Sequence, residues 1–462
     1  VNENDESLNI TEVNEPDEFV THEETVIEHF KPSTVITKSS LSRYCSCLFN
    51  ISANILCIED SAFSQCSNLK RISVESNNEQ FISQDGILFT KKMDKLICFP
   101  SKHSLSSYTI PSSVTSIGNS AFANCVNLTA ITIPSSVTSI GNKAFSGCNN
   151  LTTITVDSNN LQYESHDGIL FTKNQKTIIC FPSKHQLTDY TIPTSVTSIG
   201  DCAFDQCSKL SSVTIPTSVT SIGDSAFYKC SKLAAIAIPA NVTSIGGSAF
   251  SGCSKLTAIT IPAKVESIGD LAFYDCSVLA SIAVESRNKH YASCDGVLFN
   301  SDLAVLICFP SKHRLTKYAI SKTTTSIGNY AFSYCSSLIE IKIPTSVISI
   351  GKDAFSHCSK LRSITIPGSV ASISSYAFSY CPKLSSITIS AGVRSIGYYA
   401  FYGCASITSI TIPTTVTAIA NSSFSNCSNL ASANLPSTFK PRIDHIFPSC
   451  SKLKNITYEE NQ

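Results

Sequence analysis

The chain has 462 residues, with 34 basic and 34 acidic side chains, 21 cysteines and no tryptophan. A neutral balance provides no strong global field to recruit nucleic acid, so we expect no nucleic-acid partner. No apolar run approaches the roughly 18–20 residues that a membrane-spanning helix needs, so no membrane span is expected in this chain.

The first 42 residues lack the pattern that organises the rest of the chain. Residues 1–30 carry ten acidic side chains and no Lys or Arg. We interpret residues 1–42 as an acidic tail that leads to a cap, disordered at first and with a short helix over residues 23–30. The chain begins with Val rather than Met and shows no signal peptide, so we interpret it as either an expressed piece of a longer protein or a mature chain from which a leader was removed, and secretion stays open.

From residue 43 to residue 455 a 23-residue unit recurs, written LTAITIPSSVTSIGNKAFSGCNN at residues 128–150. Cysteines at one position of this unit are separated by 23 residues in nine gaps and by 59 residues, or 23 plus 36, in three gaps. A fixed period of this length predicts one repeat solenoid rather than several globular domains. Residues 456–462 form the C-terminal end.

Each plain coil reads as four pieces. ITI predicts a short strand with Ile131 and Ile133 inward, and Pro134 ends it because proline cannot donate to a ladder. VTSI predicts a second extended piece, Gly141 permits a turn, and NKAFSGC predicts one helical or 3₁₀ turn that buries Ala and Phe. We therefore expect sixteen parallel strands centred from residue 73 to residue 457, after a capping strand near residues 47–51.

Three longer coils of 36 residues begin near residues 75, 157 and 285. Each contains two apolar runs around a polar turn, as in DGILFTKNQKTIICFP, which predicts an inserted β-hairpin. Each continues to a Pro-Ser-Lys-His sequence. The three histidines belong to separate hairpins, so we interpret them as repeated turn chemistry rather than a shared metal or acid–base site.

Cysteine provides a second column of the repeat. Thirteen of the 21 cysteines occupy one apolar position per coil, where a thiol acts as a small buried hydrophobe. Neighbouring thiols about 5 Å apart with parallel Cβ vectors fit disulfide geometry poorly. We expect free, buried thiols rather than a bonded ladder, and no metal site, because the ligand spacing of zinc sites is absent.

The motif LxxIxIPxxVxSIGxxAFxxC, which runs over about residues 43–455, resembles the leucine-rich repeats of the BspA-like family of surface proteins. The resemblance implies a leucine-rich-repeat solenoid. One departure is that Ser replaces the usual ladder Asn, at Ser136, Ser218 and Ser346 among others, so hydroxyls must cap the bend. Members of that family are described as adhesins. The resemblance thus implies an adhesion or ligand-binding protein at the cell surface or secreted, with host or matrix proteins or cell-surface ligands as partners.

No catalytic motif, phosphate loop or cofactor-binding signature stands out, and we expect neither an enzyme nor a cofactor. The outward Thr column of the strands predicts a small-residue concave surface for protein docking. The tyrosines are more informative, since seven of the sixteen lie between residues 330 and 402. One interpretation of these tyrosines is ordinary stacking of amphipathic side chains on a convex or lateral surface. We predict instead a protein-binding or self-association surface made of Tyr330, Tyr334, His357, Tyr376, Tyr380, Tyr398, Tyr399 and Tyr402.

An intracellular, cytoplasmic interaction scaffold is the alternative function, which free cysteines favour.

Overall fold

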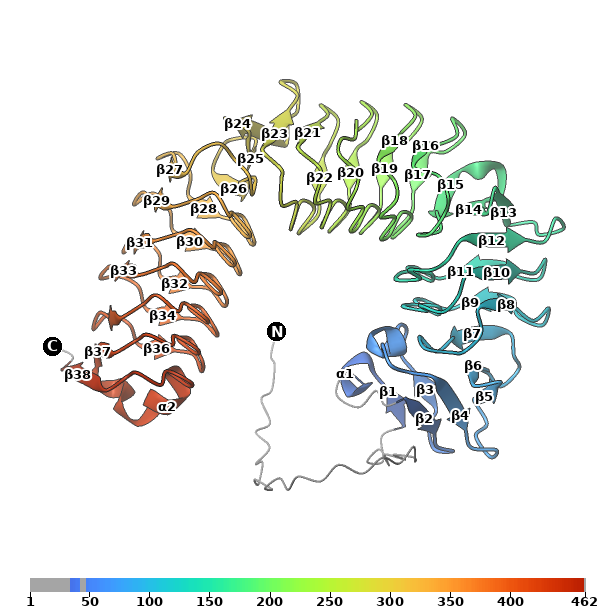
Figure 1. Cartoon of the computed structure of the whole chain (residues 1–462), viewed down its shortest axis with the longest axis horizontal. Helices are drawn as coiled ribbons and strands as arrows, with labels where there is room; N and C mark the ends of the chain where they lie inside the picture. Colours follow the sequence, from blue (N-terminus) through green and yellow to red (C-terminus); the bar gives the residue numbers. More distant parts are fainter. Residues whose placement is uncertain (1–33, 42–46, 461–462) are drawn as a thin grey trace.

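The computed structural model describes residues 34–41 and 47–460 of the chain. The acidic tail and the short helix expected at residues 23–30 lie outside these described residues. The coils stack side by side into one open arch, with the first described coil at one end and the last at the other (Figure 1). The predicted repeat solenoid is confirmed.

A first row of parallel strands contains one strand from almost every coil. Neighbours pair at the repeat spacing, as Ile131 pairs with Ile154, and the alternate side chains Ile131 and Ile133 are buried. The strands of this row are β2 Leu48–Ile51, β4 Arg71–Val74, β8 Ser107–Thr109, β10 Ala130–Ile133, β12 Thr153–Val156, β16 Asp189–Thr191, β18 Ser212–Thr214, β21 Ala258–Ile261, β23 Ser281–Val284, β27 Lys317–Ala319, β29 Glu340–Lys342, β31 Ser363–Ile366, β33 Ser386–Ile389, β35 Ser409–Thr411, β37 Ser432–Pro436 and β38 Asn455–Glu459.

One predicted strand is wrong. The segment over residues 234–238 forms no strand, so the row is interrupted between β18 and β21. This coil has Ala234 and Ala237 where both neighbouring coils have Ser or Thr, and alanine has a low β propensity because it offers little side chain to pack across a sheet. The capping strand expected near residues 47–51 is present as β2.

The second extended piece of each coil forms a second parallel row of two-residue strands. Pairs such as Ser221 with Ser244 repeat along it. Its members are β1 Val35–Ile36, β3 Cys57–Ile58, β9 Ser116–Ile117, β11 Ser139–Ile140, β17 Ser198–Ile199, β19 Ser221–Ile222, β20 Ser244–Ile245, β22 Ser267–Ile268, β28 Ser326–Ile327, β30 Ser349–Ile350, β32 Ser372–Ile373, β34 Ser395–Ile396 and β36 Ala418–Ile419. The bend between the rows is capped by hydroxyls as expected: Ser136 and Ser218 each donate to a carbonyl of the preceding coil, at 2.7 and 2.6 Å.

The three long coils contain the predicted hairpins. In each, an additional strand pairs antiparallel with the first hairpin strand, and the second hairpin strand continues into the second row by pairing in parallel with the next coil. The strands are β5 Phe81–Gln84, β6 Ile87–Thr90 and β7 Lys95–Cys98; β13 Tyr163–His166, β14 Ile169–Thr172 and β15 Thr177–Cys180; and β24 Tyr291–Cys294, β25 Val297–Asn300 and β26 Val305–Cys308. An insertion therefore widens a coil without breaking this row.

Helical structure is short. It comprises α1 Lys38–Leu41, η1 Ala62–Gln65, η2 Lys173–Gln175, η3 Ser437–Arg442 and α2 Ile443–Ile446. Two of these elements close the ends of the core: Leu41 from α1 and Ile446 from α2 are both buried. They cover the terminal coils, whose outer faces have no further repeat to stack on.

A column of stacked phenylalanine rings forms the centre of the core. Successive rings lie 4.8–6.0 Å apart, for example 4.8 Å between Phe332 and Phe355. Burial of each ring stabilises the stack by roughly 1.5–3 kcal/mol. In the long coils the Phe of Cys-Phe-Pro (Phe99, Phe181 and Phe309) takes the same place and stacks on the next coil.

Candidate protein-binding site

The segment of sequence SIGxxAFxxC, here called the turn segment, closes each regular coil. In the coil of Phe122 it contains successive four-residue turns, in which the Ala121 amide donates to the Gly118 carbonyl and the Cys125 amide donates to the Phe122 carbonyl, both at 3.2 Å. A helical or 3₁₀ turn was predicted, and 3₁₀ geometry occurs in the first coil as η1. In the regular coils, residues with positive φ divide the segment into separate turns instead.

Two residues of each regular turn segment, four positions apart, adopt the left-handed backbone conformation. Glycine occupies one of them in three coils, for example Gly403 with φ of 69°. Tyrosine occupies both in another coil, where Tyr330 and Tyr334 have φ of 58° and 60°. This conformation costs an L-residue roughly 1–2 kcal/mol. The Ala-Phe pair between the two positions is buried, whereas most of the left-handed residues, for example Ser225 and Tyr334, keep part of their surface exposed.

The turn segments lie along the inner, concave edge of the arch (Figure 1). Backbone hydrogen bonds join them in a ladder, as Phe332 donates to Ala354 at 2.7 Å and Tyr334 donates to Ser356 at 2.9 Å. The Thr column of the strands was expected to be concave, and that expectation is wrong. The turn segments, joined by this ladder, occupy the concave edge instead of the strands.

Aromatic side chains meet along one half of this edge. Tyr334, His357 and Tyr380 stack in a line, with ring centroids 4.5 and 4.7 Å apart. Tyr402 contacts Tyr380 edge-on at 4.9 Å. The line continues from Tyr402 to Tyr399 at 5.4 Å and from Tyr399 to Tyr376 at 5.1 Å. At its other end, Tyr274 contacts Tyr330 at 5.7 Å and Tyr334 at 5.2 Å.

These eight connected side chains are called the aromatic row: Tyr274, Tyr330, Tyr334, His357, Tyr376, Tyr380, Tyr399 and Tyr402. Seven of the eight predicted site residues belong to it. The eighth, Tyr398, is 56% exposed and makes none of these ring contacts. Tyr380 is 46% exposed, and the other members are half-buried, so each keeps part of its surface open to a partner.

Sequence reasoning missed Tyr274. Its turn segment and that of Tyr330 are separated by the third long coil, so equivalent positions of the two turn segments lie 59 residues apart in the sequence. The same arrangement occurs at all three long coils, because none of them contributes a turn segment of its own. We call the meeting point of two turn segments across a long coil a junction. A signal was available, since the spacing of 59 residues identifies which turn segments meet.

Charged groups border the aromatic row. Burial raises the pKa of the Asp275 and Asp353 carboxyls, and burial lowers the pKa of His357. Burial also raises the pKa of Tyr274, with a further contribution from its hydrogen bond to Tyr334. The Lys352 ammonium lies 5.8 Å from the ring centre of Tyr376. The surface thus combines aromatic rings with partly desolvated carboxylates.

The comparisons with known proteins assign the repeat. A family model described as "BspA type Leucine rich repeat region (6 copies)" matches residues 7–88, 95–178, 177–294, 307–430 and 371–462. The chain belongs to this family. The resemblance given by the sequence motif is confirmed.

Solved structures similar to this BspA-type chain include leucine-rich repeat proteins of bacteria. A leucine-rich cell surface protein from Faecalibacterium prausnitzii is 28% identical, with 82% of this chain and 92% of that chain covered and a TM-score of 0.49. Leucine-rich repeat proteins from Eubacterium ventriosum and Bacteroides ovatus are each 25% identical. They cover 77% and 82% of this chain and 80% and 98% of their own, with TM-scores of 0.45 and 0.42. A search of curated proteins found no significant match.

The Pro-Ser-Lys-His sequences of the BspA-type long coils are structural. Nε2 of His313 donates to the Asp295 carbonyl at 2.7 Å, Nδ1 accepts from the Leu315 amide at 3.2 Å, and the ring packs on Phe309 at 4.7 Å. His103 and His185 make the same contacts in their own hairpins. The interpretation as repeated turn chemistry is confirmed.

The long coils also contain a buried asparagine that sequence reasoning missed. Asn160 is 1% exposed; its amide donates to the carbonyls of Pro134 and Val137, and its side-chain oxygen accepts from the Tyr163 amide. Asn78 and Asn288 do the same. Each lies in a polar run that reads as a surface loop, so only the recurrence of Asn in all three coils could have identified it.

The cysteine column is buried and, with one exception, free. Each thiol of the regular coils contacts a carbonyl of the preceding coil, as Cys230 does with Phe204 at 3.1 Å. Cys66 in the first coil is the exception and is disulfide-bonded. The described residues contain no group of three or more His, Cys, Asp or Glu that could hold a metal ion. None of the helices in the described part of the chain is long and apolar enough to span a membrane.

Proposed function

We propose that this protein is a cell-surface or secreted ligand-binding protein that recognises a protein partner through the aromatic row on the concave edge of the solenoid. The continuous line of eight partly exposed aromatic side chains carries the proposal. Tyrosine is enriched among the residues that dominate binding energy at protein interfaces, and this chain has no tryptophan to take that role.

The backbone of the row supports a role beyond packing. Tyr330, Tyr334, Tyr376, Tyr380 and Tyr399 all have positive φ, which glycine would adopt at lower cost. Strained residues that the surrounding fold holds in place are typical of binding sites. Outside the row, the equivalent positions have small or charged residues such as Ser225 and Lys229, so the fold itself does not require a ring there.

The surface or secreted location and the adhesive role are what the resemblance to BspA-like proteins implies. The partner class that this resemblance suggests comprises host or matrix proteins or ligands on other cells. Self-association through the same row would give a dimer with stacked concave edges.

The test compares two double variants of the purified chain for binding to immobilised matrix proteins and to whole cells. Tyr334→Ser with Tyr380→Ser removes two rings of the stacked line and should weaken binding at least tenfold, about 1.4 kcal/mol, with little change in melting temperature. The matched control is Gln206→Ser with Lys229→Ser, which changes the equivalent left-handed positions outside the row. Sedimentation of the same variants tests self-association.

The proposal fails if the tyrosine variant keeps its binding and loses stability, because the rings would then act only in packing. An intracellular interaction scaffold is the second candidate. The free thiols of the described cysteine column favour it, whereas the disulfide at Cys66 favours an oxidising compartment. Mass spectrometry of the protein isolated from its own cells under alkylating conditions separates the two by the redox state of Cys66.

A further inference from the structure

The three junctions have the same architecture and different chemistry. Cavities of about 270, 220 and 80 Å³ lie at the first, second and third junction. Three equivalent residues belong to each junction: one follows the Gly or Glu of the earlier turn segment, one starts the last hairpin strand, and one follows the Gly of the later turn segment. They are Asp60, Lys95 and Asn119 at the first junction; Asn142, Thr177 and Asp201 at the second; and Asp270, Val305 and Asn329 at the third. All three line the cavity at the first and second junctions, whereas at the third Asp270 and Asn329 line it and Val305 does not.

The first junction contains its own cation. The Lys95 ammonium lies 3.5 Å from the Asp60 carboxylate, which also accepts a hydrogen bond of 2.9 Å from the Asn119 amide. This geometry shows that a cationic group fits between the two turn segments beside this carboxylate.

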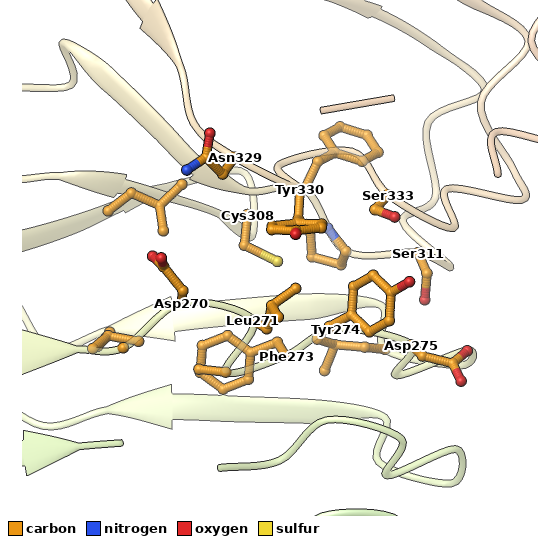
Figure 2. A pocket seen from close by; sticks show the side chains of 17 residues that line it. Asp270, Leu271, Phe273, Tyr274, Asp275, Cys308, Ser311, Asn329, Tyr330 and Ser333 are labelled. Carbon is orange, nitrogen blue, oxygen red and sulfur yellow. The ribbon is translucent and has the colours of Figure 1, made fainter. Parts of the chain in front are cut away.

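The third junction has the carboxylate without the cation. Val305 replaces the lysine, and the Asp270 carboxylate has no hydrogen-bond or ion-pair partner among the described residues. Figure 2 shows Asp270 and Asn329 at one end of the cavity, Tyr274 with Ser311 and Ser333 at the other, and Tyr330 between them. The Tyr274 and Tyr330 rings are nearly perpendicular, at 85°.

We propose that the third junction binds the guanidinium group of an arginine side chain that projects from the protein partner. The proposal rests on the proposed function, since the cavity opens at the end of the aromatic row, and it names the chemistry of the partner there. Aromatic faces attract cations, and a carboxylate pairs with guanidinium through its planar fork of donors.

The size of the cavity favours one side-chain head group over a free small molecule. A volume of about 80 Å³ holds a few water molecules, whereas sites for drug-sized ligands measure roughly 300–1,000 Å³. Nearby charge favours the same occupant. Asp275 and Asp353 lie beside Tyr274, and Asp270 and Asp353 lie beside Tyr330, with Lys352 the cation close to that ring.

The experiment measures fluorescence anisotropy of a labelled nonapeptide, three repeats of Gly-Gly-Arg, on the purified full chain. The same peptide with citrulline or lysine in place of arginine tests the charge and the planar fork. Val305→Lys copies the internal lysine of the first junction and should place a competing ammonium beside the Asp270 carboxylate, with binding reduced at least tenfold. Asp270→Asn should reduce binding about tenfold, and Asp60→Asn, which changes the equivalent carboxylate at the first junction, should leave it unchanged.

The proposal holds if arginine peptide binds at least tenfold better than citrulline peptide and both third-junction variants lose that preference. It is overturned if the citrulline or lysine peptide binds as well as arginine, or if Asp270→Asn binds as the parent chain does. Should Val305→Lys lower the melting temperature, the pair Asp270→Asn and Asp60→Asn decides alone. If the parent chain binds matrix proteins but not the arginine peptide, only the arginine site is rejected. If the double variant Tyr334→Ser with Tyr380→Ser still binds matrix proteins, the proposed function is rejected.

Discussion

At Tyr380, replacement by glycine should be less destabilising than replacement by alanine, the reverse of the usual order. Tyr380 has φ of 52°, and Gly403 occupies the equivalent position in the next coil with φ of 69°. Both replacements remove the ring contacts with His357 at 4.7 Å and Tyr402 at 4.9 Å, so this loss cancels in the comparison. What differs is the backbone.

The magnitude follows from two opposing terms. Alanine keeps the left-handed cost of about 1–2 kcal/mol, which glycine avoids. The glycine variant, compared with alanine, loses about 0.4–1 kcal/mol of its free energy of unfolding, because glycine gives the unfolded chain more conformational entropy. The glycine variant should therefore be more stable than the alanine variant by about 0.5–1 kcal/mol, measured as the difference in urea midpoints and in hydrogen exchange of residues 376–404.

The exposed Ile348, which has no positive φ, provides the control. There the alanine variant should be the more stable, by roughly 0.5–1 kcal/mol. If alanine is also the more stable at residue 380, the strain argument for the aromatic row is refuted. Both Tyr380 variants should bind the partner equally weakly, because neither has a ring.

Three further predictions concern the body of the solenoid. Cys230→Ala should lower the free energy of unfolding by only about 1 kcal/mol, because it leaves a small cavity, while Cys230→Asp should unfold its coil, because it buries a charge. In the native chain, a thiol reagent should modify only the exposed cysteines among the described residues, which are Cys47, Cys57 and Cys294. Burial raises the pKa of the Asp205 carboxyl in the folded protein above its ordinary value. The contribution of this carboxyl to stability should therefore be fully present at pH values below its ordinary pKa and be lost as the pH rises through its raised pKa. Asp205→Asn should flatten this part of a plot of urea midpoint against pH. His313→Ala should lower stability by about 2–3 kcal/mol, since it leaves a cavity and an unpaired Asp295 carbonyl, whereas the exposed His290→Ala should change little.

The repeat made most of the fold predictable. A fixed period determines which residues pair, so the register of Ile131 with Ile154 follows from counting 23 residues. The alternation of apolar and polar residues shows where each strand lies, and proline shows where it ends. The Ser136 hydroxyl donates to the carbonyl that the usual ladder Asn would be expected to cap. The alanine-rich strand at residues 234–238 failed because pattern alone does not measure how well side chains pack.

The direction of curvature was not predictable in this way. A period gives the spacing of coils along the stack, but the concave edge is the one where backbone groups approach most closely. That depends on left-handed residues such as Tyr330, whose φ no hydrophobic pattern reveals because Ser, Lys, Asp and Gly are also found there. The hydrophobic pattern also did not reveal the role of Tyr274, because its partner Tyr334 belongs to the turn segment on the other side of a long coil.

The junctions explain why binding chemistry can vary along a chain whose core hardly does. A long coil leaves the second strand row continuous and removes one turn segment, so two turn segments meet directly and their side chains bridge the gap. The first junction is bridged by Asp60 and Asn119, the second by Asp205, which accepts from Ser146 at 2.9 Å and from Gly147 at 2.7 Å, and the third by Tyr274 and its ring contacts. The Asp60 carboxylate of the first bridge is paired within the chain, and Asp205 of the second bridge is paired through Oδ2, while its buried Oδ1 has no hydrogen-bond partner. The aromatic bridge leaves the Asp270 carboxylate without a hydrogen-bond or ion-pair partner among the described residues, beside an open cavity, and this difference is why we place the proposed arginine site at the third junction and not at the other two.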